Sequence, residues 1–239
     1  MVVPAGPDGP AGTAARGAVA GPMAGTVAGT EPYPWPWDGR FSPRRCALLV
    51  VGDGLPISDA SVADVVGELI GAAVEAGVLA VRVATGRPGS TAAAGSTAAA
   101  DLPDAVWSAG PSVTAAGWDG FYGSPLDSLL RAAGRDQLLL AGRLFEIGVS
   151  STLRSANDRG YECLTLGDAC EAFSAPTRRG GLSSITMSGG IFGAIGSAAD
   201  VLGLLREPAE LANSTDSANS TDPTEPTDSA NSTDSTEER

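Results

Sequence analysis

Apolar residues in the middle of the chain form short continuous runs that alternate with longer amphipathic stretches. The run at 46–51, CALLVV, is uninterrupted, as is typical of a strand buried on both faces of a parallel sheet. Across 61–77 the apolar side chains recur at helical spacing until Gly77, which can end a helix. Residues 78–83 supply a second strand, and the right-handed crossover rule makes the two strands a parallel pair.

The same alternation continues toward the carboxyl end. Residues 126–134 indicate a helix, 138–156 a buried strand that turns into another helix, and 161–166 a further strand. In a parallel α/β sheet, ligands and catalytic groups gather at the carboxyl ends of strands and the amino ends of the following helices. We therefore expect the chemistry of this protein at the turn within 138–156.

The two ends of the chain have a different composition. The first residues are mostly Gly, Ala, Pro and Thr, and the last ones repeat ANSTD three times among Pro, Thr, Ser, Asp and Glu. Such segments bury too little apolar surface to offset the entropy of ordering. We predict disordered tails at 1–30 and 211–239 and one domain at 31–210, with an amino-terminal arm at 31–45 and a low-complexity loop at 86–104.

Within the arm, the segment EPYPWPWDG at 31–39 alternates prolines with aromatic residues. The prolines force an extended path, and the aromatic side chains favour contact with an apolar surface. Two interpretations stay open: the segment covers the domain, or its aromatic rings stack on a ligand.

The formal charge of −13 is concentrated in the carboxyl-terminal tail, which holds about half of the excess acidic residues. We interpret this tail as solvating, and such a chain disfavours nucleic acid and anionic membranes as partners. No apolar run approaches the length of a membrane span, and the first residues do not resemble a signal peptide. The expected localisation is cytoplasmic.

The chain has three Cys, without paired CxxC spacing, and no His. We expect buried, reduced thiols. The absence of His excludes Ser-His-Asp and Cys-His catalysis and His-ligated zinc within the isolated chain. The GDG at 52–54 is neither a GxGxxG fingerprint nor a P-loop, which disfavours a nucleotide site. With His also absent, we predict no metal and no cofactor.

The segment LLLAGRLFEIGVSSTLRSA at 138–156 and its continuation ANDRGYECLTLGDAC resemble the core of the isochorismatase-like cysteine hydrolases. Within that family the resemblance is to the branch that hydrolyses biuret, triuret and related ureides. It extends over about 31–205, from the Pro-aromatic arm to GLSSITMSGGIFGAIGSAADVLGLL near the end. The resemblance implies a three-layer α/β/α domain with a mostly parallel sheet of about six strands, assembled into oligomers.

The resemblance also implies an Asp general base after the first strand, a Lys that stabilises negative charge and a Cys nucleophile in the turn before the later helix. The matching positions here are Gly52, Ala115 and Gly148. Asp53 stands one residue late, and side-chain alternation along a strand should turn it away from the site. Ser151, a turn beyond Gly148, has neither His nor a placed Lys to deprotonate it.

The remaining family positions outline a possible vestigial cleft. Arg143, Leu144 and Phe145 are bulkier than the residues of relatives, whose cis peptide bond in this turn corresponds to Arg143–Leu144. Glu146 is expected to cap or accept hydrogen bonds rather than act as a base. Cys170, lacking a neighbouring carboxylate or amine, is expected to keep an ordinary thiol pKa. The candidate cleft residues are Asp53, Phe121, Tyr122, Arg143, Leu144, Phe145, Glu146, Asp168 and Cys170.

With all three catalytic positions replaced while the surrounding packing residues remain, the sequence predicts a pseudoenzyme. It would serve as a non-catalytic subunit or regulator that assembles with itself or with an active paralogue, or as a binder of a small amide or ureide. The alternatives are an active hydrolase of C–N bonds that uses Asp53, Asp168 or Cys170, and a decaying gene product without a selected role.

Overall fold

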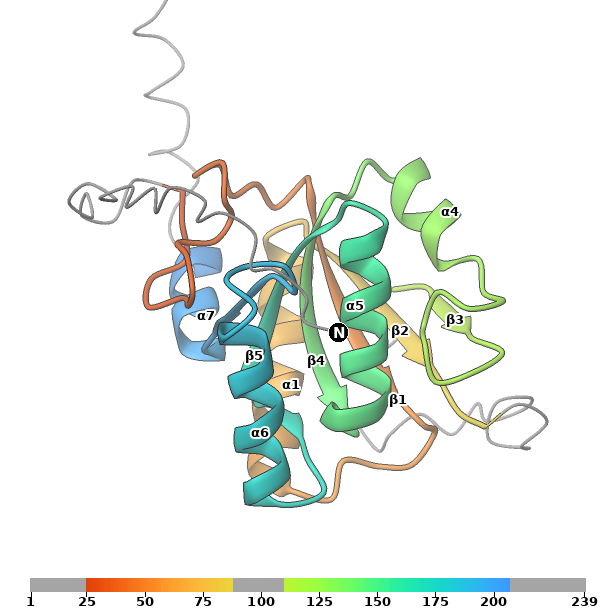
Figure 1. Cartoon of the computed structure of the whole chain (residues 1–239). Coiled ribbons are helices and arrows are strands. Elements are labelled where there is room, and N and C mark those ends of the chain that lie inside the picture. The colour runs from red at the N-terminus through yellow and green to blue at the C-terminus, as the bar shows by residue number, and fades with distance from the viewer. Residues whose placement is uncertain (1–24, 88–109, 207–239) are drawn as a thin grey trace, which may run out of the picture. The chain divides into compact units, whose positions relative to one another are not determined.

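The computed structural model describes residues 25–87 and 110–206 (Figure 1). These residues form a six-stranded sheet with the order β3-β2-β1-β4-β5-β6, and every strand is parallel to its neighbours. The predicted parallel sheet is therefore confirmed. The strands are β1 (Cys46–Gly52), β2 (Leu79–Ala84), β3 (Ser112–Thr114), β4 (Gln137–Arg143), β5 (Glu162–Glu171) and β6 (Ala194–Gly196).

Helices cover both faces of the sheet, as the three-layer prediction requires (Figure 1). Helices α1 and α7 pack on one face, and α4, α5 and α6 pack on the other. Their bounds are α1 (Ala60–Glu75), α4 (Leu126–Ala132), α5 (Ser150–Asp158), α6 (Ala175–Thr186) and α7 (Ala198–Arg206).

The central strand β1 shows why the apolar run was so continuous. Leu48 and Val50 pack into the core beneath α1 and α7, while Leu49 and Val51 pack into the opposite core. Since successive side chains of a strand point to opposite faces, both faces need apolar residues. Helix α1 begins where the Asp59 carboxylate accepts a hydrogen bond from the backbone N–H of Ser61, at 2.9 Å.

The arm joins the edge of the sheet. Glu31 and Ile195 exchange backbone hydrogen bonds of 2.9 and 2.7 Å, so the arm runs antiparallel to β6 and covers this edge strand. Trp35 is completely buried in the α1/α7 core. The surface-covering interpretation of the arm therefore holds for Trp35.

The folded part begins before residue 31, which corrects the boundary drawn from composition. Val27 is 2% exposed and its N–H donates to the carbonyl of Trp35 at 2.8 Å. The small residues around Val27 hid this contact, because one buried valine hardly changes the composition of a segment. The rest of the predicted amino-terminal tail, residues 88–104 of the predicted loop and the acidic tail lie outside the described residues.

Candidate functional site

The three family positions converge at the carboxyl ends of the strands, which we call the carboxyl edge of the sheet. Gly52 ends β1 and pairs with Ala84, the last residue of β2. The N–H of Thr85 donates to the carbonyl of Gly52 at 2.7 Å, and the N–H of Ala115 donates to the carbonyl of Ala84 at 2.8 Å. Gly52 and Ala115 therefore flank the end of β2, where Thr85 stands.

Gly148 approaches the same residue from another element. It lies in the π-helical turn η1 (Phe145–Val149), which leads from β4 into α5. A Cβ atom added at Gly148 would lie 3.0 Å from Oγ1 of Thr85 and 3.4 Å from Cγ1 of Val51. Thr85 is thus the centre of this arrangement. No sequence motif singled out Thr85, although its place two residues after the predicted strand at 78–83 was a usable signal.

The groups around Thr85 offer little chemistry. Thr85 is 1% exposed, and its hydroxyl donates to the carbonyl of Gly52 at 3.2 Å. An added Cβ at Gly52 would meet nothing within 4 Å, so there is open space at the position where the resemblance predicted a carboxylate. The sequence contains no lysine, since all 15 basic residues are arginine, and no histidine. The site therefore contains no lysine amine and no imidazole from this chain.

Asp53 is held by Arg143. Nε of Arg143 lies 3.0 Å from Oδ1 of Asp53, and Nη1 lies 3.1 Å from Oε2 of Glu171. The three side chains are only 19%, 13% and 12% exposed for Arg143, Asp53 and Glu171. Nη1 of Arg143 also donates to the carbonyl of Pro56, in the loop that leads to α1. Asp53 therefore belongs to a structural ion-pair cluster, which we call the Arg143 cluster.

The turn after β4 differs from the expectation of a cis peptide bond. The cis bonds of the described residues are Glu31–Pro32 and Trp35–Pro36, and Arg143–Leu144 is trans. Instead, Leu144 adopts the left-handed conformation, with a φ of 58°. Two residues earlier, Gly142 is required, because a Cβ there would lie 2.0 Å from the carbonyl oxygen of Val51.

Two acidic candidates cap helices instead of facing Thr85. Glu146 accepts hydrogen bonds from the N–H of Phe173, at 3.1 Å, and from the hydroxyl of Thr177, at the start of α6. Asp168 accepts one from the N–H of Ala198, at 2.8 Å, in the first turn of α7. Asp168 thus lies on the α1/α7 side of the sheet, away from Gly148, which corrects the expectation that it faces the cleft.

The aromatic candidates divide into a buried and an exposed one. Phe121 is 5% exposed and stacks on Tyr161, with ring centroids 5.7 Å apart. Phe145 is also buried, and it fills the space beside Gly181 of α6, where an added Cβ would lie 2.5 Å from its ring. Tyr122 is 62% exposed. Of the three, only Tyr122 offers a surface to a ligand.

All three cysteine thiols are buried. Cys170 is 1% exposed, and burial raises the pKa of its thiol to about 12. The expectation of an ordinary thiol pKa is therefore wrong, because it considered missing neighbours and not desolvation. Cys46 and Cys163 are buried as well, and burial also raises the pKa of each. All three cysteines are free thiols, as predicted.

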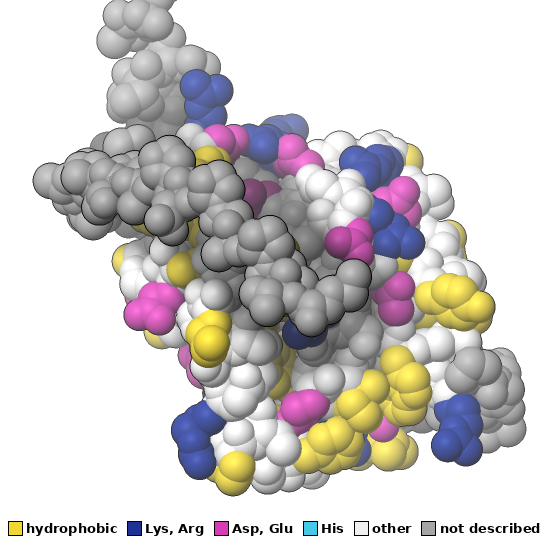
Figure 2. Space-filling model, viewed as in Figure 1, with side chains coloured by type: hydrophobic (Ala, Val, Ile, Leu, Met, Phe, Trp, Pro, Cys, Tyr) yellow, Lys and Arg dark blue, Asp and Glu magenta, His cyan; other side chains and the backbone are white. Residues whose placement is uncertain are grey.

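The surface on the α5 side is partly hydrophobic near the carboxyl ends of the strands. Figure 2 shows hydrophobic side chains gathered toward the carboxyl ends of the strands on this face, with acidic side chains among them.

Within 25–87 and 110–206, no three His, Cys, Asp or Glu residues are placed to hold a metal ion. In the same ranges, no helix combines the length and apolar character that a membrane crossing needs.

Known proteins match short stretches of this chain in sequence. An uncharacterized isochorismatase family protein of Escherichia coli, YecD, is 38% identical over 68 residues, covering 28% of this chain and 36% of that protein. The ureidoacrylate amidohydrolase RutB of Methylorubrum extorquens is 39% identical over 64 residues, covering 27% of this chain and 26% of that protein. The matches thus span about a third or less of these relatives.

A cysteine hydrolase structure from Pseudomonas syringae pv. phaseolicola has a TM-score of 0.58 and 21% identity, covering 69% of this chain and 94% of that one. This likeness supports the fold. The isochorismatase domain model matches residues 56–199, more than half of the chain and a range that includes Ala115 and Gly148. As the resemblance in the sequence predicted, the chain belongs to the isochorismatase family.

Proposed function

We propose that this isochorismatase-family protein is a pseudoenzyme that acts as a non-catalytic subunit, a regulator or a small-ligand binder. The observation that carries the proposal is the set of Gly52, Ala115 and Gly148 around Thr85. In this arrangement no side chain supplies a thiolate, a carboxylate or an ammonium group. Acyl transfer from an amide needs a nucleophile and a group that moves its proton. Here the hydroxyl nearest to Gly148 is that of Thr85, which is buried, donates to the carbonyl of Gly52 and has no base beside it.

The alternative, a hydrolase of altered mechanism, finds little support. Asp53 is bound to Arg143, Asp168 caps α7, and Cys170 is fully buried with a raised thiol pKa. A thiol with a pKa of about 12 is almost entirely protonated near neutral pH and is therefore a poor nucleophile. None of the three candidates combines access, charge state and a position beside Gly148.

The decisive experiment measures turnover by the native chain and by a restored variant. The substrates are biuret, triuret, isochorismate, simple amides and ureidoacrylate, which is included because one relative is a ureidoacrylate amidohydrolase. The restored variant carries Gly52→Asp, Ala115→Lys and Gly148→Cys. It is made with and without Thr85→Ala, because the added Cβ at Gly148 lies only 3.0 Å from Oγ1 of Thr85.

We expect the native chain to be inert and the restored variant to gain turnover. A second variant with Gly148→Ala in place of Gly148→Cys is the matched control, since it adds the Cβ without the thiol. Activity in the native chain would overturn the proposal. Activity in the Gly148→Ala control would show that the thiol is not the restored nucleophile.

The molecular role is tested separately from catalysis. Assembly into homo-oligomers, or into hetero-oligomers with an active paralogue, predicts a native mass above that of one chain, or co-purification of the paralogue. Binding of a small amide or ureide predicts saturable thermal stabilisation without turnover. A monomer that shows neither behaviour would leave the pseudoenzyme without a subunit or binding role.

A further inference from the structure

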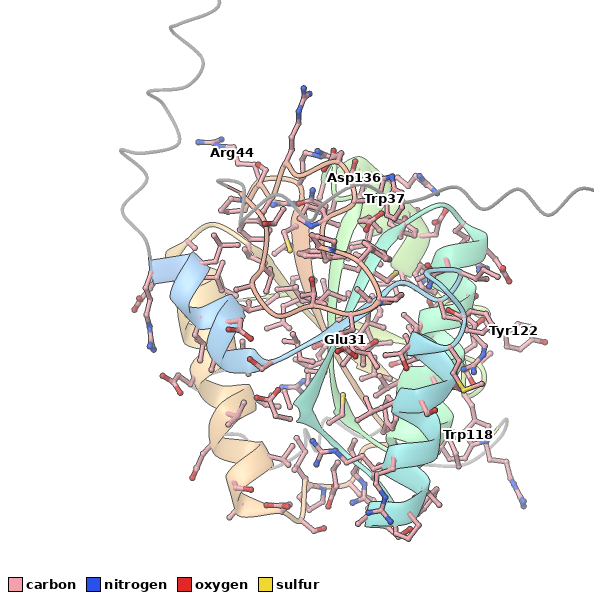
Figure 3. The ribbon with its side chains drawn as sticks, turned by 60° about the vertical axis from the view of Figure 1, so that its left-hand side comes forward. Glu31, Trp37, Arg44, Trp118, Tyr122 and Asp136 are labelled. Carbon is pink, nitrogen blue, oxygen red and sulfur yellow. The ribbon has the colours of Figure 1, made fainter. Side chains whose placement is uncertain are left out.

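A pocket lies at the amino ends of the strands, which we call the amino edge of the sheet, whereas Gly148 lies near their carboxyl ends. Its volume is about 340 Å³, and it is lined by Tyr33, Trp37, Glu162, Gly189, Gly190 and Ile191. Glu162 is the first residue of β5, so the pocket lies at the amino ends of the strands. Trp37 and Asp136 lie at this end, and Trp118 and Tyr122 lie well away from it (Figure 3). This volume is in the range of small-ligand sites.

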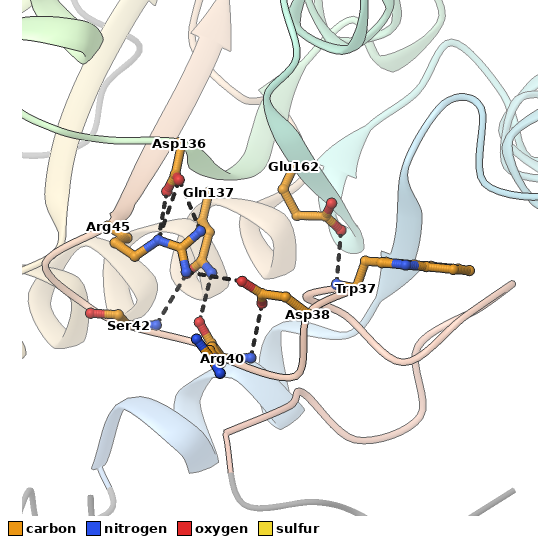
Figure 4. A network of polar contacts seen from close by, with 8 residues as sticks. All are labelled: Trp37, Asp38, Arg40, Ser42, Arg45, Asp136, Gln137 and Glu162. Carbon is orange, nitrogen blue, oxygen red and sulfur yellow. Dashed lines mark hydrogen bonds and ion pairs between the residues drawn. The ribbon is translucent and has the colours of Figure 1, made fainter. Parts of the chain in front are cut away.

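The Glu162 carboxylate is fixed through one of its oxygens. Oε1 accepts a hydrogen bond from the N–H of Trp37 at 3.2 Å (Figure 4). It also accepts one from the hydroxyl of Tyr33 at 2.9 Å. Burial of the Tyr33 ring, with the Glu162 charge beside it, raises the pKa of the Tyr33 hydroxyl, so it stays a hydrogen donor. Among the described residues, no ion pair involves Glu162.

The indole of Trp37 forms an exposed wall beside this carboxylate. Trp37 is 65% exposed, while Trp35, two residues earlier, is completely buried. Its ring meets the ring of Tyr33 edge to face, with centroids 5.0 Å apart and planes at 73°. The ring contact and the N–H bond to Glu162 therefore hold Trp37 in place while most of its side chain stays exposed.

The far side of the pocket is apolar. Ile191 is 71% exposed, although it is a large hydrophobic residue. Gly190 has a φ of 103°, and a Cβ there would lie 3.1 Å from Cε1 of Tyr33. A side chain at Gly190 would therefore be strained and would crowd Tyr33. The pocket combines one carboxylate, one exposed aromatic ring and an apolar wall.

We propose that this pocket binds an organic cation through a guanidinium or ammonium group. The cation would donate to Oε2 of Glu162, forming a charge-assisted hydrogen bond. Its flat or alkyl part would lie over the Trp37 indole, whose ring face attracts positive charge. An anion would meet the Glu162 charge, and a purely apolar ligand would bury that charge without a partner.

The test measures dissociation constants of methylguanidine and agmatine by calorimetry or saturation-transfer NMR on the full chain. N-methylurea serves as the neutral analogue and should bind at least tenfold more weakly than methylguanidine. Glu162→Gln keeps an acceptor for Tyr33 and Trp37 but removes the charge, and should weaken methylguanidine binding by about tenfold. Trp37→Ala should weaken it by about threefold.

Glu75→Gln removes an equal charge at an exposed position of α1 and should leave binding unchanged. N-acetylarginine amide distinguishes an arginine side chain of a peptide from a free cation: comparable or tighter binding assigns the pocket to peptide arginine, and weaker binding assigns it to free cations. The proposal is overturned if methylguanidine and N-methylurea bind equally, or if Glu162→Gln binds like the native chain while circular dichroism shows it folded. These results do not depend on the turnover assays.

Discussion

The carboxyl edge and the amino edge of the sheet carry similar kinds of side chains, but these differ in whether they have partners within the protein. At the carboxyl edge, where catalysis is expected in this fold, Arg143 is occupied by Asp53 and Glu171. At the amino edge, Glu162 and Trp37 form a pocket in which an indole face remains exposed. A charged or aromatic residue near the ends of the strands therefore does not by itself make a binding site. The atoms that would contact a ligand must also be free of hydrogen bonds and ion pairs within the protein.

The ion pairs at the two edges differ in burial as well. In the Arg143 cluster every side chain is between 12% and 19% exposed. At the amino edge, Arg45 lies 3.1 Å from Asp38 and 2.8 Å from Asp136, and these side chains are 39% to 50% exposed (Figure 4). Water screens the second group much more strongly than the first.

The largest expected effect comes from breaking the Arg143 cluster. In Arg143→Met, the carboxylates of Asp53 and Glu171 stay near the protein interior without their common partner. We expect the free energy of unfolding to fall by about 2–3 kcal/mol, somewhat less than for a fully buried pair. Urea unfolding at neutral pH, followed by far-UV circular dichroism, measures the change.

Arg45→Met is the matched control, because it also removes one arginine from between two carboxylates. Its expected cost is about 1 kcal/mol or less, since the pairs are exposed. Equal losses in the two variants would contradict the distinction between the edges. A much smaller loss in Arg143→Met would mean that Asp53 is available for chemistry after all.

The next effect concerns the buried thiol of the carboxyl edge. Burial raises the pKa of Cys170 to about 12, above the value of about 8.5 expected for an unfolded chain. The unfolded state therefore loses this proton first as the pH rises. The stabilisation is fully present below about pH 8.5 and is lost progressively toward pH 12. From pH 8 to 10 this one thiol should lower the free energy of unfolding by about 2 kcal/mol.

Comparison with Cys170→Ala isolates this contribution, because Cys46 and Cys163 are unchanged in the variant. The variant should lose about 2 kcal/mol less stability than the native chain between pH 8 and 10. Parallel pH profiles for the two proteins would indicate an accessible thiol. The position of Cys170 as a candidate nucleophile would then be reopened.

The helices and strands could be predicted from the sequence because each produces a local pattern of apolar and polar residues. The apolar run of β1 and the helical stripe of α1 each identify themselves within one element. Strand β5 was harder, since Gly167 and Asp168 suggested that it ends at Leu166. It continues through a register shift against β4 to Glu171, which brings Glu171 to Arg143.

The sites depend instead on contacts between distant parts of the chain. No local pattern indicates that Arg143 binds Asp53, ninety positions earlier, or that Glu162 meets the N–H of Trp37. The family resemblance supplied the positions of Gly52, Ala115 and Gly148, but it said nothing of Thr85 between them. Side-chain partners across the sheet could be assigned only once strand order and register were known.

The smallest expected effect tests Glu146 as a helix cap. Glu146 accepts from the N–H of Phe173 and from the hydroxyl of Thr177, where Ser174 begins α6 with a capping box. A carboxylate at a helix amino terminus also interacts favourably with the helix dipole. Glu146→Ala removes both effects and should lower the free energy of unfolding by about 1 kcal/mol.

Glu75→Ala is the matched control, because Glu75 lies exposed in the last turn of α1, where a negative charge opposes the dipole. This variant should be neutral or slightly stabilising in the same urea titration. If Glu146→Ala were also neutral, Glu146 would not be needed for α6. Glu146 would then resemble Glu162, a charged residue to which we assign a role in binding and not in stabilising the fold.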